Sequence, residues 1–229
     1  MNYYRPIVSY GKNRPKHAMP IAGGNAWFSE VEKLSRNENS TIITLKDVPG
    51  DILNNITRKR SNFSGLSMSN AHVMGVLNVT PDSFSDGGQH YDVDIAVRRG
   101  KEMLDEGASI VDIGGESTRP GADFVDRFSE LNRVSPVVDT LAKLGIISVD
   151  TRKADVAREA ISQGAMIFND VSSLSFDPRS LNVLAESGAS VCLMHASGDP
   201  QTMQDNPTYD DVLLDVYDFL MSLILPETT

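Results

Sequence analysis

From residue 71 onward, short apolar runs alternate with segments whose apolar residues recur at helical spacing. The apolar runs are nearly continuous, which is typical of strands buried on both faces. A regular alternation of strand and helix predicts an α/β fold with a parallel sheet, either doubly wound or closed into a barrel. The helical segment at 125–141 contains Pro136, which should kink or restart the helix. We expect the strands at 73–79, 109–113, 146–149, 166–168 and 191–194.

The first 70 residues differ in character from the rest of the chain. Residues 41–45 are a plausible short strand and residues 47–60 a plausible helix. Residues 61–70 are rich in Ser and Asn, which is typical of a linker. We therefore expect residues 1–70 to form an N-terminal extension, of unknown role, and residues 71–229 to form the main domain.

Composition restricts the partners that the chain can have. The net charge of −10 and the pI of about 4.8 argue against nucleic acid or an anionic membrane as a partner. Cys192 is the single cysteine, so no disulfide can form within the chain, which fits a reducing compartment. The first 20 residues lack an apolar targeting segment, and the apolar runs are too short to span a bilayer. These features predict a cytoplasmic protein.

Polar side chains occur at or just beyond the end of every predicted strand. Because the carboxyl ends of parallel strands lie on one rim of a sheet, residues far apart in sequence can meet there. Helix capping and turn closure are the alternative explanation for each residue taken alone. The five candidates are Asn78, Arg119, Asp150, Asn169 and His195.

The residue types of this set indicate the chemistry of a ligand. Asp150 and Asn169 offer acceptors and an amide edge that suit a flat, amide-like heterocycle. The side-chain oxygen of Asn78 is a ligand that Mg²⁺ accepts. Arg119 and the glycine-rich loop at 114–121 could hold phosphate oxygens or a carboxylate.

The connection after the first predicted strand is unusually long. Its eleven residues, Asn78 to Gly88, read NVTPDSFSDGG, whereas such connections usually have two to six residues. Excess length of this kind is typical of functional loops, and we expect this one to close over a ligand.

At this point the motifs resemble those of dihydropteroate synthase, a pterin-binding family of the folate pathway. The segment at 75–88 is similar to the first loop motif of that family, and the segment at 114–122 is similar to the second. Later elements match in order, and the resemblance covers residues 71–224. These elements are Val149-Asp150-Thr151, Asn169-Asp170 and the Met194-His195 segment with Gly198, Pro200, Met203 and Gln204.

The resemblance implies a TIM barrel and a transferase that sulfonamides inhibit. The family joins 6-hydroxymethyl-7,8-dihydropterin diphosphate to 4-aminobenzoate with Mg²⁺, giving 7,8-dihydropteroate and diphosphate, and it acts as a homodimer. By resemblance Asn78 would bind Mg²⁺ and diphosphate, and Asp150 and Asn169 would bind the pterin. Asn78, Arg119 and Asp150 would be catalytic. Thr118 and Arg119 would contact diphosphate, Thr118 to Pro120 would frame the aminobenzoate site, and Asp82, Ser83 and Phe84 would belong to the closing loop.

The chain departs from the family pattern after the fifth unit. The motifs that the family carries on its sixth, seventh and eighth strands are absent from the 229 residues. We therefore expect a C-terminally truncated, partial barrel with little or no turnover of its own. Two alternatives are a non-catalytic fragment that binds pterin or diphosphate, and a pterin-binding methyltransferase domain. The second would lack the loop motif at 78–88, so the sequence disfavours it.

Overall fold

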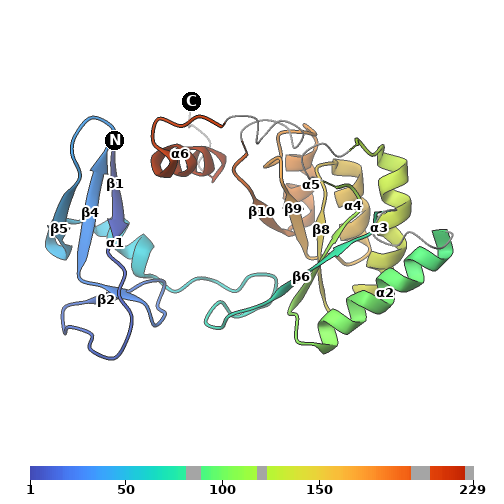
Figure 1. Ribbon diagram of the computed structural model, residues 1–229, viewed down its shortest axis with the longest axis horizontal. Helices are drawn as coiled ribbons and strands as arrows, with labels where there is room; N and C mark the ends of the chain where they lie inside the picture. The colour runs from blue at the N-terminus through green and yellow to red at the C-terminus, as the bar shows by residue number, and fades with distance from the viewer. Residues whose placement is uncertain (81–88, 118–122, 197–206, 225–229) are drawn as a thin grey trace. The chain divides into compact units, whose positions relative to one another are not determined.

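A computed structural model describes residues 1–80, 89–117, 123–196 and 207–224. The chain separates into two compact units (Figure 1). Unit 1 contains residues 1–71 with 211–215, and unit 2 contains residues 72–210 with 216–229.

Unit 1 is a small antiparallel structure. Strands β1 (Asn2–Pro6), β4 (Glu30–Ser35) and β5 (Thr41–Thr44) form a three-stranded sheet in the order β1-β4-β5, and β2 (Met19–Pro20) pairs with β3 (Trp27–Phe28). Phe28, Val31 and Val48 form its core, against which residues of the helix α1 (Gly50–Thr57) pack. The predicted strand at 41–45 is confirmed. The predicted helix at 47–60 is shorter than expected, because a 3₁₀ turn, η1 (Leu45–Asp47), and Pro49 precede it. Strands β1 and β4 were missed, because neither is a continuous apolar run.

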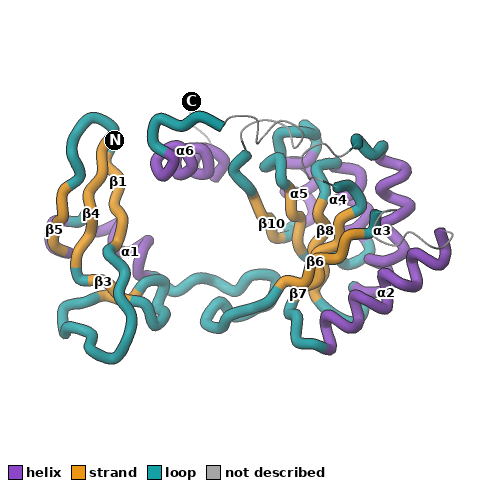
Figure 2. The backbone as a smooth tube through the Cα atoms, in the orientation of Figure 1, coloured by secondary structure: helices purple, strands orange, loops and turns teal. Residues whose placement is uncertain are grey.

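Unit 2 contains a five-stranded parallel sheet, and every predicted strand is confirmed to within about two residues. The strands, drawn orange in Figure 2, are hydrogen-bonded neighbours in the order β10-β9-β8-β7-β6. Each strand lies next to the strand that precedes it in the sequence, always on the same side of it. Right-handed crossovers therefore place every connection on the same face of the sheet. A doubly wound sheet would reverse direction, so the winding is that of a barrel. The strands are β6 (Met74–Asn78), β7 (Ile110–Gly114), β8 (Ile146–Asp150), β9 (Ile167–Asp170) and β10 (Ser190–Leu193).

The helices of unit 2 cover one face of this sheet. Leu77, Val111 and Ile147 point to that face and pack against apolar residues of the helices. Helix α3 continues through Pro136 without a restart. Gly100 of α2 permits close packing against α3, because a Cβ there would lie 2.3 Å from Leu141 Cδ1. These helices are α2 (Gln89–Asp105), α3 (Arg127–Leu141), α4 (Ala154–Ser162) and α5 (Ser180–Ser187). The last helix, α6 (Val212–Ile224), belongs to unit 1 at residues 212–215 and to unit 2 from residue 216 onward.

Strand residues that alternate with this core point to the opposite face. Val76 is 59% exposed, whereas its neighbour Leu77 is 2% exposed. Val76 pairs in register with Asp112, which in turn pairs with Ser148. Since side chains alternate along a strand, one face of the sheet carries the apolar core and the other carries this mixed row.

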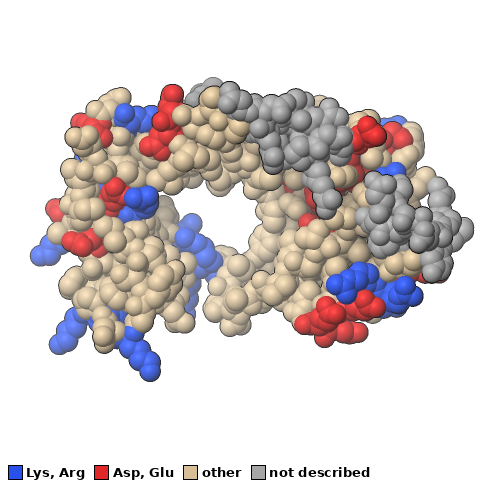
Figure 3. Space-filling view, viewed as in Figure 1, with Lys and Arg blue, Asp and Glu red and all other residues tan. Residues whose placement is uncertain are grey.

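The surface of the described residues agrees with the acidic composition. On the face drawn in Figure 3, basic and acidic side chains are interspersed and do not form one continuous basic area. One example is Arg99, which pairs with Glu102 at 3.1 Å on helix α2. Within the described ranges, no helix is long and apolar enough to cross a bilayer.

Candidate active site

Three of the predicted site residues lie in one row at the carboxyl rim of the sheet. Asn78 pairs in register with Gly114, Gly114 with Asp150, and Asp150 with Asn169. The row continues to Cys192 on β10, which is half-buried on this face and is not part of the core. Parallel register thus brings together side chains that are 91 residues apart in the sequence, from Asn78 to Asn169.

Gly114 leaves room in the middle of this row. A Cβ placed on Gly114 would lie 3.5 Å from Asp150 Oδ2 and 3.7 Å from Asn78 Oδ1. The two oxygens therefore flank a space that any other residue would fill. Within the described ranges, no cluster of three His, Cys, Asp or Glu side chains could hold a metal ion. Mg²⁺ commonly takes one or two protein oxygens and completes its shell with substrate phosphates and water, so the Asn78 oxygen fits such an ion.

The electrostatic state of Asp150 is unusual. Burial raises its pKa to about 7, and the negative charge of Asp112 adds to the shift. Its Oδ1 atom is buried and has no hydrogen-bond partner among the described residues. A buried acceptor without a donor costs free energy, so this oxygen indicates a ligand that supplies an N–H or O–H group.

A second buried carboxylate lies on β7, two residues before Gly114 and therefore further from the carboxyl rim. Asp112, in the middle of β7, is 5% exposed. Its Oδ2 accepts a hydrogen bond of 3.0 Å from Nδ2 of Asn169, two strands away in the sheet. Burial raises the pKa of Asp112. Our sequence reasoning did not select Asp112 as a site residue, although an aspartate inside an apolar run was the available signal.

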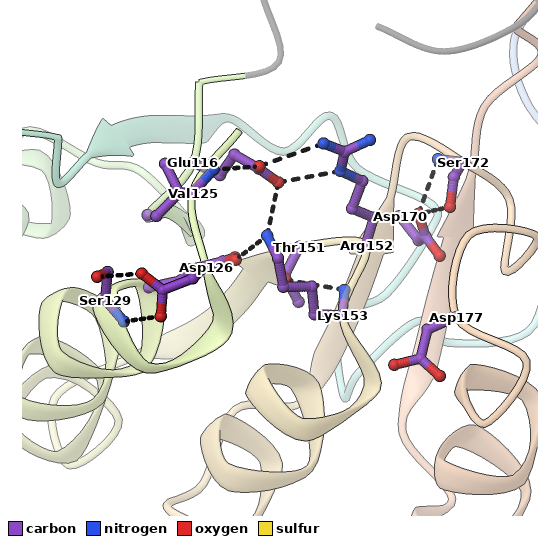
Figure 4. A network of polar contacts seen from close by, with 12 residues as sticks. Glu116, Val125, Asp126, Ser129, Thr151, Arg152, Lys153, Asp170, Ser172 and Asp177 are labelled. Atoms are coloured by element: carbon purple, nitrogen blue, oxygen red, sulfur yellow. Dashed lines mark hydrogen bonds and ion pairs between the residues drawn. The ribbon is translucent and has the colours of Figure 1, made fainter. Parts of the chain in front are cut away.

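An ion-pair network supports the loop that follows β7 (Figure 4). Glu116 accepts hydrogen bonds from Arg152 Nε at 3.0 Å, Arg152 Nη2 at 3.2 Å and Lys153 Nζ at 2.8 Å. Its Oε1 also accepts from the backbone N–H of Val125 at 3.0 Å. Although burial opposes it, these donors lower the pKa of Glu116. Glu116 thereby links the backbone of Val125 to Arg152 and Lys153, which directly precede α4.

Lys153 links this network to helix α3. Its ammonium group lies 2.6 Å from Glu130 Oε2, and Glu130 is fully buried. A Cβ on Gly115 would lie 2.7 Å from Val134 Cγ2 and 2.9 Å from Glu130 Cγ, so α3 approaches the loop closely only because residue 115 is glycine. None of these roles was predicted from the sequence, because each depends on contacts between distant segments.

The remaining predicted site residues have other positions. His195 follows β10, where its ring packs edge-on against Phe219 of α6 with a centroid distance of 4.9 Å and also lies near Tyr209. Its ring contacts are thus with aromatic side chains. The remaining predictions lie outside the described residues. These are Asp82, Ser83 and Phe84 of the first loop and Thr118, Arg119 and Pro120 of the second.

A parallel sheet wound in one direction, with carboxylate and amide side chains gathered at its carboxyl rim, defines a protein of the α/β-barrel class, in which ligand sites lie at that rim. Comparison with known families makes the assignment specific. The model of the pterin binding enzyme family matches residues 74–224. The chain therefore belongs to the family of pterin binding enzymes.

Known relatives place the chain next to one enzyme of this family. The dihydropteroate synthase of Escherichia coli is 51% identical over 163 residues, which are 70% of this chain and 57% of that protein. The dihydropteroate synthase of Bacillus subtilis is 48% identical over 154 residues, 66% of this chain and 52% of that protein. The chain thus spans little more than half the length of these curated relatives.

Solved structures agree with the fold. The crystal structure of the Yersinia pestis dihydropteroate synthase with a sulfonamide drug complex has a TM-score of 0.64 and 49% identity, covering 69% of this chain and 58% of that one. The Xanthomonas albilineans enzyme with 4-aminobenzoic acid has a TM-score of 0.62 and 45% identity, covering 69% and 56%. The relatives are TIM barrels, and the prediction of a TIM-barrel family member with five βα units is confirmed.

Proposed function

We propose that this chain carries the pterin and diphosphate site of a dihydropteroate synthase, whose reaction joins 6-hydroxymethyl-7,8-dihydropterin diphosphate to 4-aminobenzoate with release of diphosphate. The observation that carries the proposal is the convergence of Asn78 and Asp150 oxygens over Gly114, with Asn169 in the same row. The 51% sequence identity to a curated dihydropteroate synthase over 163 residues supports the substrate assignment.

In the proposed reaction, Asp150 and Asn169 hold the pterin ring by hydrogen bonds at the rim of the sheet. Loss of diphosphate leaves positive charge on the methylene carbon of the pterin, which the ring delocalises. The carboxylate of Asp150, in its buried position, stabilises that charge more strongly than it would in water. The neutral amine of 4-aminobenzoate then attacks the carbon and gives up one N–H proton to the released diphosphate or to water, and its fixed orientation lowers the entropic part of the barrier.

Asn78 is the proposed protein ligand of Mg²⁺, together with oxygens of the diphosphate. When bound, Mg²⁺ would neutralise the negative charge of the leaving group. We further propose, from the sequence motifs, that Thr118 and Arg119 contact the diphosphate and that Pro120 helps to frame the aminobenzoate site. Asp82, Ser83 and Phe84 are proposed to belong to a loop that excludes water during the reaction.

Calorimetry and a turnover assay test the proposal together. We expect the 229-residue chain to bind the pterin diphosphate, more tightly with Mg²⁺ than without it. Asn78→Ala should abolish the Mg²⁺ effect, because it removes the proposed metal ligand. Asn182→Ala, at an exposed position on α5, is the matched control and should leave binding unchanged. Absence of binding by the wild-type chain would refute the proposal.

Turnover separates an enzyme from a binding fragment. Formation of dihydropteroate from labelled 4-aminobenzoate would support the enzyme, and its inhibition by a sulfonamide would support the proposed drug sensitivity. Binding without any product would instead support the non-catalytic pterin-binding fragment.

The proposal also covers the localisation, the oligomeric state and the domains of the chain. We propose a cytoplasmic homodimer in which residues 1–70 form a separate extension and residues 71–229 carry the site. Light scattering of the purified chain measures the oligomeric state. Limited proteolysis should cut first within residues 61–70 and release two fragments, because that segment is rich in Ser and Asn.

A further inference from the structure

The hydrogen bond between Asn169 and Asp112 fixes which way the Asn169 amide lies. Nδ2 of Asn169 donates to Asp112 Oδ2 at 3.0 Å, and 57 residues separate the two in sequence. Because an amide group is planar, its oxygen then points away from Asp112. The reversed amide would place its oxygen against the carboxylate, so that two acceptors would face each other whenever Asp112 is ionised.

With the Asn169 amide in this orientation, two neighbouring side chains at the rim have hydrogen-bond acceptors available to a ligand. Asn169 presents its oxygen, and Asp150, its register partner on β8, presents the buried, unpartnered Oδ1. Two neighbouring acceptors are satisfied by two neighbouring N–H donors. A 2-amino-4-oxopyrimidine ring carries such a pair, in its ring N–H and its amino group. A 2,4-dioxopyrimidine ring has an acceptor where the amino group would be.

We propose that Asp112 is a positioning residue that holds the Asn169 amide with its oxygen toward the ligand, and so selects a heterocycle with two adjacent N–H donors. Asp112 itself does not touch the ligand in this proposal, because it lies further from the carboxyl rim than Asp150 and Asn169. It acts on the ligand only through Asn169. The identity of the heterocycle as a pterin rests on the proposed function, whereas the orientation of the amide does not.

Side-chain amide NMR tests the orientation without any ligand. In the wild-type chain we expect one Hδ2 proton of Asn169 to exchange slowly with solvent and to show a nuclear Overhauser contact with the Hβ protons of Asp112. In Asp112→Asn, the slow exchange should be lost. An Asn169 amide that exchanges freely in the wild-type chain would overturn the proposal, even if the variant fails to fold.

Ligand selectivity tests the consequence of that orientation. We expect the wild-type chain to prefer 6-hydroxymethylpterin over 6-hydroxymethyllumazine, its 2-oxo counterpart, and Asp112→Asn to reduce this preference by about 10-fold, which is about 1.4 kcal/mol. In an Asn169→Ala background, Asp112→Asn should change the preference by less than about 2-fold, because no amide remains to be oriented. Equal effects in both backgrounds would overturn the proposal.

Asp170→Asn is the matched control, because Asp170 is a buried aspartate next to Asn169 on β9. Asp170 is fully buried, and its carboxylate accepts from the backbone N–H groups of Ser172 at 2.7 Å and Leu174 at 2.9 Å. This change should lower stability but leave the pterin preference intact, and an equal loss of preference would count against a specific role for Asp112. If the wild-type chain binds neither compound, the proposed function fails, while the NMR measurement still decides the role of Asp112.

Discussion

Replacing Lys153 by Met removes the cation that lies between two buried carboxylates. Lys153 Nζ is 2.8 Å from Glu116 Oε2 and 2.6 Å from Glu130 Oε2, and all three side chains are at most 6% exposed. Glu116 keeps its two hydrogen bonds from Arg152, but Glu130 loses its ion-pair partner. Met has a similar volume, so packing changes little and the electrostatic effect dominates.

The expected loss of stability follows from the burial of Glu130. Breaking a buried ion pair by removing one partner costs about 3–5 kcal/mol, because a charge is left without compensation. That is a large part of the roughly 5–15 kcal/mol that a domain has in total. With a urea dependence of about 2 kcal/mol per molar, the midpoint of unfolding of unit 2 should fall by about 2 M.

The loss should depend on pH. Burial raises the pKa of Glu130, and the hydrogen bond from Lys153 opposes that shift. Without Lys153 the pKa rises further. A carboxyl group with a raised pKa in the folded state favours folding at low pH, where it is neutral, and this advantage is lost as pH rises through that pKa. The deficit of Lys153→Met should therefore be larger at pH 8 than at pH 5, and Glu130→Gln in the same chain should restore part of the stability.

Two optical probes separate the units in this experiment. Circular dichroism at 222 nm reports mainly on the helices of unit 2, whereas fluorescence of Trp27, the single tryptophan, reports on unit 1. Lys143→Met is the matched control, since Lys143 is 67% exposed and pairs with Asp139 on the surface. It should change stability by less than about 1 kcal/mol. A loss below about 1 kcal/mol for Lys153→Met at pH 8, or a loss that does not vary with pH, would refute the reasoning.

A pair of adjacent glycines and the pKa of Asp150 give the remaining predictions. Gly115→Ala should lower the unfolding free energy of unit 2 by about 1–3 kcal/mol in urea denaturation, because its Cβ would lie 2.7 Å from Val134 Cγ2. Gly114→Ala should leave stability nearly unchanged and weaken binding of pterin diphosphate, because its methyl group would fill the space between Asn78 and Asp150; the opposite pattern in the two variants would contradict this. Burial and the charge of Asp112 raise the pKa of Asp150 to about 7, so the folded chain binds this proton more tightly than the unfolded chain, whose pKa is about 3.9. The unfolding free energy should therefore fall as pH rises from about 4 to 7, and denaturation of Asp150→Asn across that range should show a smaller fall; identical pH profiles would disprove the shift.

The sequence by itself determined the type and order of the elements in unit 2. Continuous apolar runs and helical spacing are local patterns, so they placed all five parallel strands and their helices. The rule that parallel strands share a carboxyl rim predicted that Asn78, Asp150 and Asn169 meet there with Arg119 and His195, and the register places the first three in one row. In unit 1 the same approach missed β1 and β4, whose stability comes from antiparallel pairing and not from an apolar run.

Tertiary structure alone decided the partners of the buried charges. The alternation of strand and helix by itself left open a doubly wound or a barrel-type sheet, the motif resemblance implied the barrel, and the strand order confirms the barrel winding. By contrast, nothing local shows that Asn169 donates to Asp112 or that Lys153 joins Glu116 to Glu130. A side chain's type fixes what it can bind, whereas its partner depends on which distant segments the fold brings within hydrogen-bonding distance.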